Sequence, residues 1–407
     1  MNILLVLLIS AGPFLTMTWT TKTAMPQARA GCGCAVISDT VYVIGGRDSA
    51  GNRYAENHVY FPASDSWTTR ASMPTARAHL GAAYVNGKIY AIGGWVGSVA
   101  TGACEEYDPV SDTWLARASM PTPRYTLAIA AVTGKIYVFG GMNMSGQIFN
   151  TVEEYDPVGN TWATKAVMPT ARMGPACAVV RDTVYVYGGS TVVGGGLTAV
   201  NQYYVPANDT WGTKASLPSV RYCAAGFSYQ NKAFSLGGYD FSNYLTLCNV
   251  YDPSTNVWSS ETPMQNGRQS LAAAVVGNCV YAIAGWNNGS LNYTEEGMFT
   301  TGVEENDAKG STGLSMNVCP NPFHDRTDIR LTLNGAGSTT SDGTLKIYDA
   351  TGCLVSSFVL SSSFIHHPLS FSWNGTDQSG RQLPGGVYLL VAEINGVRQS
   401  QKLIIAR

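Results

Sequence analysis

Six arginines recur at intervals of 47 to 49 residues and are the side chains best suited to hold an anion. A guanidinium group presents N–H donors in a planar fork that matches a carboxylate or phosphate. Equivalent positions of a repeating fold come together, so these groups are predicted to ring one mouth of a central channel. Two roles stay open: ligand binding, or tying each loop to the carbonyls of a neighbouring unit. The arginines are Arg29, Arg77, Arg124, Arg172, Arg221 and Arg268.

A second set of candidate binding residues follows a glycine pair in each unit, and its members differ from unit to unit. Variable side chains on a rigid frame are where binding specificity usually lies. Aromatic faces beside arginines suit a sugar or an extended peptide. Partial burial against adjacent loops is the alternative. The set consists of Arg47, Trp95, Met142, Ser190, Tyr239 and Trp286, together with Tyr125 and Tyr222, which follow two of the arginines.

Catalytic groups are scarce on the predicted innermost strands. They carry no carboxylate and one histidine, His79, which is more often a structural donor than a base. A cysteine nucleophile needs a nearby histidine and an electropositive setting. An enzyme would therefore have to use a loop carboxylate such as Asp240 or Glu56. The segments are 31–37, 79–85, 126–132, 174–180, 223–228 and 270–276.

Metal and cofactor sites are not predicted. The repeat region holds two histidines, His58 and His79, and the pair at 366–367 has no further ligand group near it in the sequence. Glutamate pairs recur on the third strand of three units, away from the channel, and are predicted to lie on solvated faces. They occupy positions 105–106, 153–154 and 295–296.

The candidate residues are positioned by a unit of about 48 residues that occurs six times, a signature to be sought before any other. Each unit has a glycine pair, degenerate at Ala284-Gly285, and a tryptophan. The glycines permit positive φ and close approach of strands. The tryptophans and the tyrosines at 42, 90, 137, 185 and 281 are predicted to fill space within and between units. The tryptophans are Trp19, Trp67, Trp114, Trp162, Trp211 and Trp258.

Each unit is predicted to form a four-stranded antiparallel meander, because turn residues separate short alternating segments. One meander cannot bury both faces, but six arranged radially can, which gives an all-β, six-bladed β-propeller. Trp19 precedes the first glycine pair and belongs to an orphan fourth strand. Joining residues 18–25 to the strands of 268–300 completes the sixth blade and removes two open edges.

On these features the units resemble kelch repeats: a glycine pair after an apolar strand, a tyrosine 13 to 15 residues on, and a tryptophan seven residues later, as in Tyr107 to Trp114. The resemblance covers roughly residues 18–300 and weakens in the last unit. It implies that the arginines contact carboxylates, as in relatives that bind acidic peptides. Some six-bladed bacterial relatives are sialic-acid epimerases. Two histidines are too few for the copper site of kelch oxidases.

Composition agrees with a globular chain: 407 residues, 45% hydrophobic, 13% charged and 44 glycines. A net charge of −2 excludes an electrostatic footprint for nucleic acid or an anionic membrane.

Residues 1–17 are predicted to be a signal peptide, since the apolar run at 3–15 is too short to span a bilayer. The nine cysteines form no framework. Those at 32, 34, 177 and 223 are predicted to be small buried thiols, with a disulfide at 32 or 34 left open.

Residues 303–315 have the composition of a linker, and the repeat region is assigned to 18–302. Beyond the linker, residues 316–407 are predicted to form a small immunoglobulin-like β-sandwich. Its motifs resemble the C-terminal sorting domain of the type IX secretion system and the related flagellar-hook-capping domain. The matching residues are Asn321-Pro322-Phe323, Leu345 to Asp349 with Gly352, Trp373-Asn374-Gly375 with Asp377 and Gly380, Gly386-Val387-Tyr388, and the tail from Lys402.

That resemblance implies export across a bacterial outer membrane, with secretion machinery as a partner of 316–407 and a secreted or cell-surface product. Such a signal is a receptor-read address and not an anchor. Three functions remain open. The first is a protein that binds a glycan or peptide through the arginine–aromatic rim. The second is a sugar-acting enzyme resembling the epimerases, and the third a structural or adhesive spacer. Fold alone decides none of them.

Overall fold

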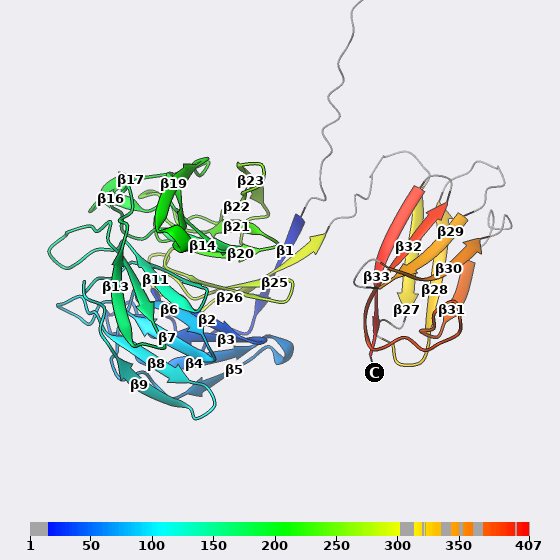
Figure 1. Ribbon diagram of the computed structural model, residues 1–407, viewed down its shortest axis with the longest axis horizontal. Helices are drawn as coiled ribbons and strands as arrows, with labels where there is room; N and C mark the ends of the chain where they lie inside the picture. The colour runs from blue at the N-terminus through cyan, green and yellow to red at the C-terminus, as the bar shows by residue number, and fades with distance from the viewer. Residues whose placement is uncertain are drawn as a thin grey trace, which may run out of the picture. The chain divides into compact units, whose positions relative to one another are not determined.

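Two separate units make up the computed structural model, which describes residues 15–301, 313–319, 321, 323–334, 343–349, 353–360, 369–394 and 397–406. One unit spans residues 15–300, and the other contains the described residues from 301 onward. Both are built of β-strands (Figure 1). No α-helix occurs among the described residues, and so none could span a membrane. Residues 1–14 of the predicted signal peptide and the 366–367 histidines lie outside the described ranges.

The first unit contains six four-stranded antiparallel sheets, one for each repeat. In five of them the strands follow one another along the chain. The first two sheets consist of β2 (Gly33–Ile37), β3 (Thr40–Ile44), β4 (Asn57–Phe61) and β5 (Ser66–Arg70), and of β6 (Gly81–Val85), β7 (Lys88–Ile92), β8 (Cys104–Asp108) and β9 (Thr113–Arg117). The next three consist of β10 (Ala128–Val132), β11 (Lys135–Phe139), β12 (Val152–Asp156) and β13 (Thr161–Lys165); of β14 (Ala176–Val180), β15 (Thr183–Tyr187), β18 (Asn201–Val205) and β19 (Thr210–Lys214); and of β20 (Ala225–Tyr229), β21 (Lys232–Leu236), β22 (Cys248–Asp252) and β23 (Val257–Glu261). Two 3-10 turns, η1 (Pro62–Ser64) and η2 (Pro206–Asn208), and a small hairpin of β16 (Ser190–Val192) and β17 (Gly195–Leu197) lie in connections.

The remaining sheet joins the two ends of the repeat region. Its order is β1 (Leu15–Lys22), β26 (Thr294–Thr301), β25 (Cys279–Ile283) and β24 (Ala272–Val276). The strand that carries Trp19 therefore lies beside the strands of the last repeat, the pairing that the position of Trp19 predicts. The first strands of the sheets contact one another in a closed cycle, β2, β6, β10, β14, β20 and β24. This arrangement is a β-propeller, with β2 and β24 brought together by the closing sheet.

Tight turns and small residues explain why each sheet forms. The β6–β7 and β10–β11 hairpins turn at Asn86-Gly87 and Thr133-Gly134, where both residues have positive φ, as type I′ turns require. The second strand of each sheet is almost wholly buried, as in the pattern of β7. It lies between other strands on both edges and between neighbouring sheets on both faces.

The repeat tryptophans link neighbouring sheets through hydrogen bonds as well as packing. The indole Nε1–H of Trp114 donates to the Ala71 carbonyl of the preceding sheet at 2.7 Å. Trp19 makes the same bond to Thr262 at 2.9 Å across the closure. The same bond recurs for Trp67, Trp162, Trp211 and Trp258. Their predicted space-filling role therefore includes a directional link between sheets.

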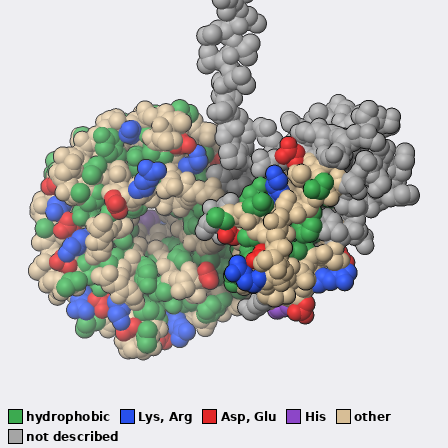
Figure 2. Space-filling model, turned by 45° about the vertical axis from the view of Figure 1, so that its right-hand side comes forward, with side chains coloured by type: hydrophobic (Ala, Val, Ile, Leu, Met, Phe, Trp, Pro, Cys, Tyr) green, Lys and Arg blue, Asp and Glu red, His purple; other side chains and the backbone are tan. Residues whose placement is uncertain are grey.

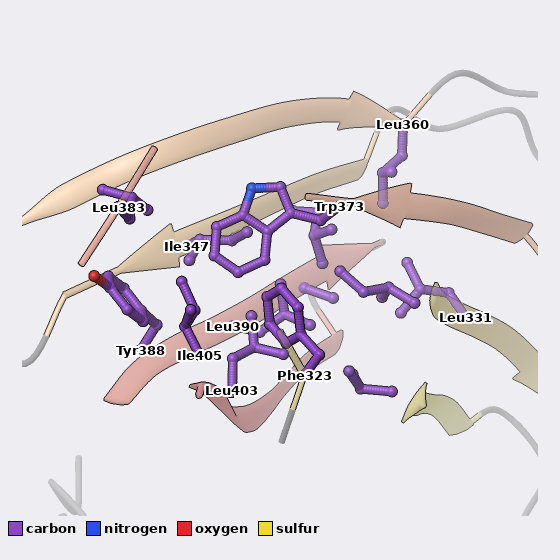
Figure 3. Packing of buried hydrophobic residues seen from close by; sticks show 14 residues of the cluster. Phe323, Leu331, Ile347, Leu360, Trp373, Leu383, Tyr388, Leu390, Leu403 and Ile405 are labelled. Atoms are coloured by element: carbon purple, nitrogen blue, oxygen red, sulfur yellow. The ribbon is translucent and has the colours of Figure 1, made fainter. Parts of the chain in front are cut away.

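The second unit has two sheets that share one apolar core. Its three-stranded sheet has the order β27 (Gly313–Cys319), β28 (Thr327–Asn334), β31 (Leu369–Trp373), and its four-stranded sheet the order β30 (Leu354–Leu360), β29 (Gly343–Tyr348), β32 (Gly386–Ile394), β33 (Val397–Ile405). Trp373 lies at the centre of the core in Figure 3, with Phe323 at 5.6 Å and Tyr388 at 6.2 Å between ring centroids. The core belongs to this unit alone, so the unit has its own source of stability.

Closure by the first strand is testable through Trp19, which is largely buried. We expect Trp19→Phe to lower the free energy of unfolding by about 1 kcal/mol through loss of the indole hydrogen bond. Trp19→Ala should cost about 3–5 kcal/mol because it also leaves a cavity. Urea unfolding followed by fluorescence measures both. Trp162→Phe removes the same bond within the array and is the control. An effect of Trp162→Phe without one of Trp19→Phe would show that β1 does not close the ring.

Candidate functional site

Six residues, each two positions after a repeat arginine, form a closed ring of backbone hydrogen bonds around the central channel. The N–H of each donates to the carbonyl of its counterpart in the preceding sheet at 2.7–3.0 Å, and the Gly31 N–H closes the ring on Ser270. All six have φ between +50° and +67°, a left-handed region that costs energy for most residues other than glycine. The ring consists of Gly31, His79, Thr126, Gly174, Cys223 and Ser270.

The channel beside this ring carries little charge of its own. Leucines 80, 127 and 271 border a cavity of about 100 Å³ at the ring, and the unit is hollowed near its centre in Figure 2. Burial, with the nearby Arg47 charge, lowers the pKa of His79 to about 4, so the ring is neutral at pH 7. Burial raises the pKa of the Cys34 and Cys177 thiols to about 12. A thiolate nucleophile is therefore disfavoured here.

Four of the predicted rim residues gather on one side of the mouth, around Arg47. Its guanidinium carbon lies 4.4 Å from the ring centre of Trp286 and 6.0 Å from that of Trp95. Tyr125 stacks on Trp95 with ring centres 6.3 Å apart and lies equally far from His79. All four side chains are half-buried. Cation–π contacts of this kind hold a guanidinium in place while leaving its N–H edge free to donate.

A second arginine, Arg53, belongs to the same group. Its guanidinium lies 4.0 Å from the centre of the Trp95 ring, and its backbone bridges to that of Arg47. Within residues 15–301 neither arginine takes part in an ion pair. Burial and the charge of Arg53 both lower the pKa of Arg47, although Asp48 opposes them. Two like charges held side by side without an acid make this part of the mouth attractive to an anion. We call Arg47, Arg53, Trp95, Trp286 and Tyr125 the cationic–aromatic cluster.

Two further predicted rim residues lie in a separate aromatic group. Tyr222 and Tyr239 have ring centres 6.1 Å apart, Phe241 stacks on Tyr222 at 5.1 Å, and Tyr244 stacks on Tyr239 at 4.7 Å. This tyrosine cluster lies on the sheet of β20–β23 and its loop. The mouth thus has a cationic part and an uncharged aromatic part.

Comparison with known proteins identifies the repeats. Residues 13–189 match the family model of the KLHDC2/KLHL20/DRC7 kelch-repeats domain, and residues 221–265 match the kelch motif. Kelch repeats therefore occur within the propeller. A solved structure titled "Structure of YjhT" shares the fold, with a TM-score of 0.60 and 17% identity over 70% of this chain and 98% of that one. No curated protein matches the chain.

The six kelch-repeat arginines are not part of the mouth surface, which corrects the prediction that they bind ligand. Their side chains are at most 1% exposed. Each donates to the side chain at the second position of the third strand of its own sheet. Five also donate to backbone carbonyls, as Arg77 does to Ala91 at 2.9 Å. In order, the partners are His58, Glu105, Glu153, Gln202, Asn249 and Glu295.

The arginine side chains act within a sheet, and their backbones connect sheets. The second glycine of each pair donates its N–H to the arginine carbonyl of the next sheet, as Gly94 does to Arg124 at 2.9 Å. A side chain on Gly94 would meet the backbone of Ala78 at 3.0 Å. Of the two roles predicted for the repeat arginines, the structure shows hydrogen bonding to carbonyls. The side chains bond to carbonyls of their own sheet, however, and not to those of a neighbouring sheet.

The glutamate pairs are not solvated, and that prediction is wrong. The first of each pair bonds to a repeat arginine. The second residue of each pair is buried at Glu106 and Glu296 and half-buried at Glu154. It pairs with a basic residue of the fourth strand, as Glu106 does with Arg117 at 2.7 Å. The error arose because alternation places one residue of a pair inside a sheet stack, where only a buried cation makes a carboxylate tolerable.

The other predicted residues are occupied or covered. Met142 and Ser190 are buried. The Asp240 carboxylate accepts the Ser242 N–H of its own loop at 2.8 Å, and Glu56 lies 3.7 Å from Arg29. Both carboxylates therefore already have a partner within the propeller. Among the described residues, no set of three or more His, Cys, Asp or Glu is arranged to hold a metal.

The sequence reasoning missed Arg53 and Phe241. Both lie in the variable loops after a glycine pair and have no counterpart in the other repeats, so periodicity could not find them. The signal that could have revealed them is that they break the pattern of the repeat. An arginine six residues after Arg47 stands out in loops that carry few other basic side chains.

The pairing of buried arginines with third-strand side chains can be tested through the free energy of unfolding. Glu153→Ala should lower the free energy of unfolding by about 3 kcal/mol, because it leaves the Arg124 charge buried without its acid. Glu153→Gln should cost less, since glutamine already serves Arg172 at the equivalent position. Glu154→Ala is the matched control: it removes a partly exposed pair with Lys165 and a hydrogen bond from Tyr137, and should cost less, about 1–2 kcal/mol. Equal losses for Glu153→Ala and Glu154→Ala would contradict this.

Proposed function

We propose that the chain is an exported six-bladed kelch propeller that binds an anionic glycan or peptide at the cationic–aromatic cluster of its mouth. The observation that carries the proposal is Arg47, held between Trp286 and Trp95 beside Arg53. Neither guanidinium meets a carboxylate within residues 15–301. Elsewhere in the propeller each fully buried arginine has a polar side-chain partner on the third strand of its sheet, so this unpaired pair stands apart.

The ligand's anionic group would accept hydrogen bonds from the edges of the two guanidinium groups. Charge-assisted bonds of this kind are short and about twice as strong as neutral ones. Trp95 and Trp286 restrict the arginine rotamers before binding, which reduces the entropy lost on complex formation. The tyrosine cluster would contact the remainder of the ligand, whether a sugar face or a side chain, because aromatic hydroxyls combine apolar area with hydrogen bonding.

Binding is tested by screening the intact protein against arrays of acidic and neutral glycans and peptides. We expect acidic ligands to bind, and Arg47→Ala to weaken binding about 10- to 100-fold, the loss of one or two charge-assisted hydrogen bonds. Binding should also weaken as salt rises. Arg70→Ala changes an exposed arginine of the outer strand β5 and is the matched control.

Two results would contradict this proposal. Acidic ligands that bind Arg47→Ala as tightly as the unaltered protein would exclude the cluster as the site. Failure of every acidic ligand to bind would favour the spacer function, with the propeller as scaffold only. Turnover of a bound sugar would instead support the sugar-acting alternative and make His79 and Tyr125 the first residues to replace.

We further propose that the C-terminal unit is an immunoglobulin-like sorting domain read by type IX secretion machinery. The support is the set of sorting-domain motifs together with a core confined to this unit. Phe323 of the Asn321-Pro322-Phe323 motif is buried there, and Asn321 bonds to the backbone of Lys402 and Ile404 in the tail. The motif at the start of the domain is thus tied to the strand at its end.

Deletion of 316–407 should retain the protein inside the cell, because the address is removed while the propeller keeps its own core. Immunoblots of cell and culture fractions measure the distribution. As a reciprocal control, residues 303–407 attached to an unrelated reporter with a signal peptide should direct that reporter outside. Normal release of the deleted protein would overturn the sorting assignment without affecting the binding proposal.

A further inference from the structure

A cavity of about 370 Å³ lies between two neighbouring sheets, at the end opposite the mouth. On one side it is bordered by the β14–β15 turn and the start of β15, and on the other by the β20–β21 turn and the end of β22. Its volume is in the range of small-molecule sites, roughly 300–1,000 Å³. Polar side chains dominate its lining, which includes Arg181, Thr183, Tyr185, Asn231, Lys232 and Ser254.

The sheet of β14, β15, β18 and β19, on one side of this cavity, lacks a tyrosine–glutamate pair that three other sheets have. In three other sheets the tyrosine at the third position of the second strand bonds to a third-strand glutamate: Tyr90 to Glu106, Tyr137 to Glu154 and Tyr281 to Glu296. At the equivalent place Tyr185 is paired in register with Tyr203, so no carboxylate is present. Tyr42, opposite Val59, also lacks one. Within residues 15–301 the Tyr185 hydroxyl makes no hydrogen bond, and its residue lines the cavity.

Arg181 is the second departure. The β14–β15 turn places it at φ +56°, the left-handed conformation that this turn position has in the other sheets as well. The counterparts at this turn position in four other sheets are uncharged: Ser38, Asn86, Thr133 and Gln230. Arg181 is exposed and, among residues 15–301, takes part in no ion pair. Burial raises the pKa of the Tyr185 hydroxyl, and the nearby Arg181 charge opposes that effect.

The charges of the lining determine the ligand class. Lys232 is paired with Asp252 at 2.5 Å, as lysines are at the same place in two other sheets. This pair is neutral overall, so Arg181 leaves one net positive charge. The remaining polar groups are hydroxyls and amides, which both donate to and accept from ligand hydroxyls. Pro253 and Val180 add a small apolar surface.

We propose that this inter-sheet cavity is a second ligand site, which binds a monosaccharide-sized hydroxy acid such as a uronic acid. Arg181 holds the carboxylate, and Tyr185, Asn231 and Thr183 bond to hydroxyl groups. The site is independent of the mouth, because no lining residue belongs to the cationic–aromatic cluster or the tyrosine cluster.

Isothermal titration of the intact protein with D-glucuronate tests the proposal, with D-glucose as the neutral match. We expect glucuronate to bind with a dissociation constant of about 1 mM or below, and glucose at least about 10-fold more weakly, the loss of one charge-assisted interaction. Arg181→Gln should reduce glucuronate binding to the level of glucose. Tyr185→Phe should weaken both sugars about 3- to 10-fold.

Two controls separate this site from the mouth and from misfolding. Arg47→Ala weakens any binding of glucuronate at the mouth, and the binding that remains should still be lost when Arg181→Gln is added. Arg70→Gln should have no effect. Arg181 is an exposed turn residue, so the melting temperature of Arg181→Gln should match that of the unaltered protein. Absence of glucuronate binding, equal binding of glucose, or binding that survives Arg181→Gln would each overturn the proposal. Loss through Arg47→Ala alone would assign the sugar acid to the mouth.

Discussion

The ring of six backbone hydrogen bonds around the channel is the constraint on which the propeller depends. It can close only if each sheet contributes one residue with left-handed φ at the start of its first strand, and each does. Backbone bonds carry no side-chain specificity, so glycine, serine, threonine, cysteine and histidine all occupy the ring at modest conformational cost. The requirement explains why the arginine lies two residues earlier in every repeat. That spacing directs its side chain into the sheet stack and its carbonyl toward the glycine pair of the sheet before it.

Electrostatics separates the repeat arginines from the two arginines of the cationic–aromatic cluster. The six repeat arginines are buried away from water. Their charges are tolerated because third-strand side chains (acids, amides or a histidine) and backbone carbonyls replace water as hydrogen-bond partners. Arg172 and Arg221 lack a carboxylate, and burial lowers the pKa of each to about 10, which still leaves them charged at pH 7. Arg47 and Arg53 are held by aromatic faces and have no acid to satisfy them within the propeller. The first kind stabilises the fold, and the second is available to a partner.

Departures from the repeat mark both candidate sites. The mouth cluster arises where loops after the glycine pair carry arginine or tryptophan. The inter-sheet cavity arises where Tyr203 stands opposite Tyr185 and an arginine occupies the β14–β15 turn. Six near-equivalent sheets act as internal controls for one another, since a side chain that recurs in phase serves the shared architecture. A side chain without a counterpart serves something that the architecture does not require. The same logic separates the Lys232–Asp252 pair, which recurs, from Arg181, which does not.

The amino-acid sequence by itself determined the number of repeats, the four strands in each and the pairing of the Trp19 strand with the last repeat. These follow from periodic turn residues and from the one tryptophan left over, which are local signals that persist through folding. Tertiary structure alone decided which charges are buried. Arg77 and Glu105 read in the sequence as a ligand-binding cation and a solvated acid, yet they form one desolvated pair. The stacking of Arg47 and Arg53 on two tryptophans from neighbouring sheets was likewise not predictable, because solvent exclusion depends on how sheets pack and not on the spacing of residues along the chain.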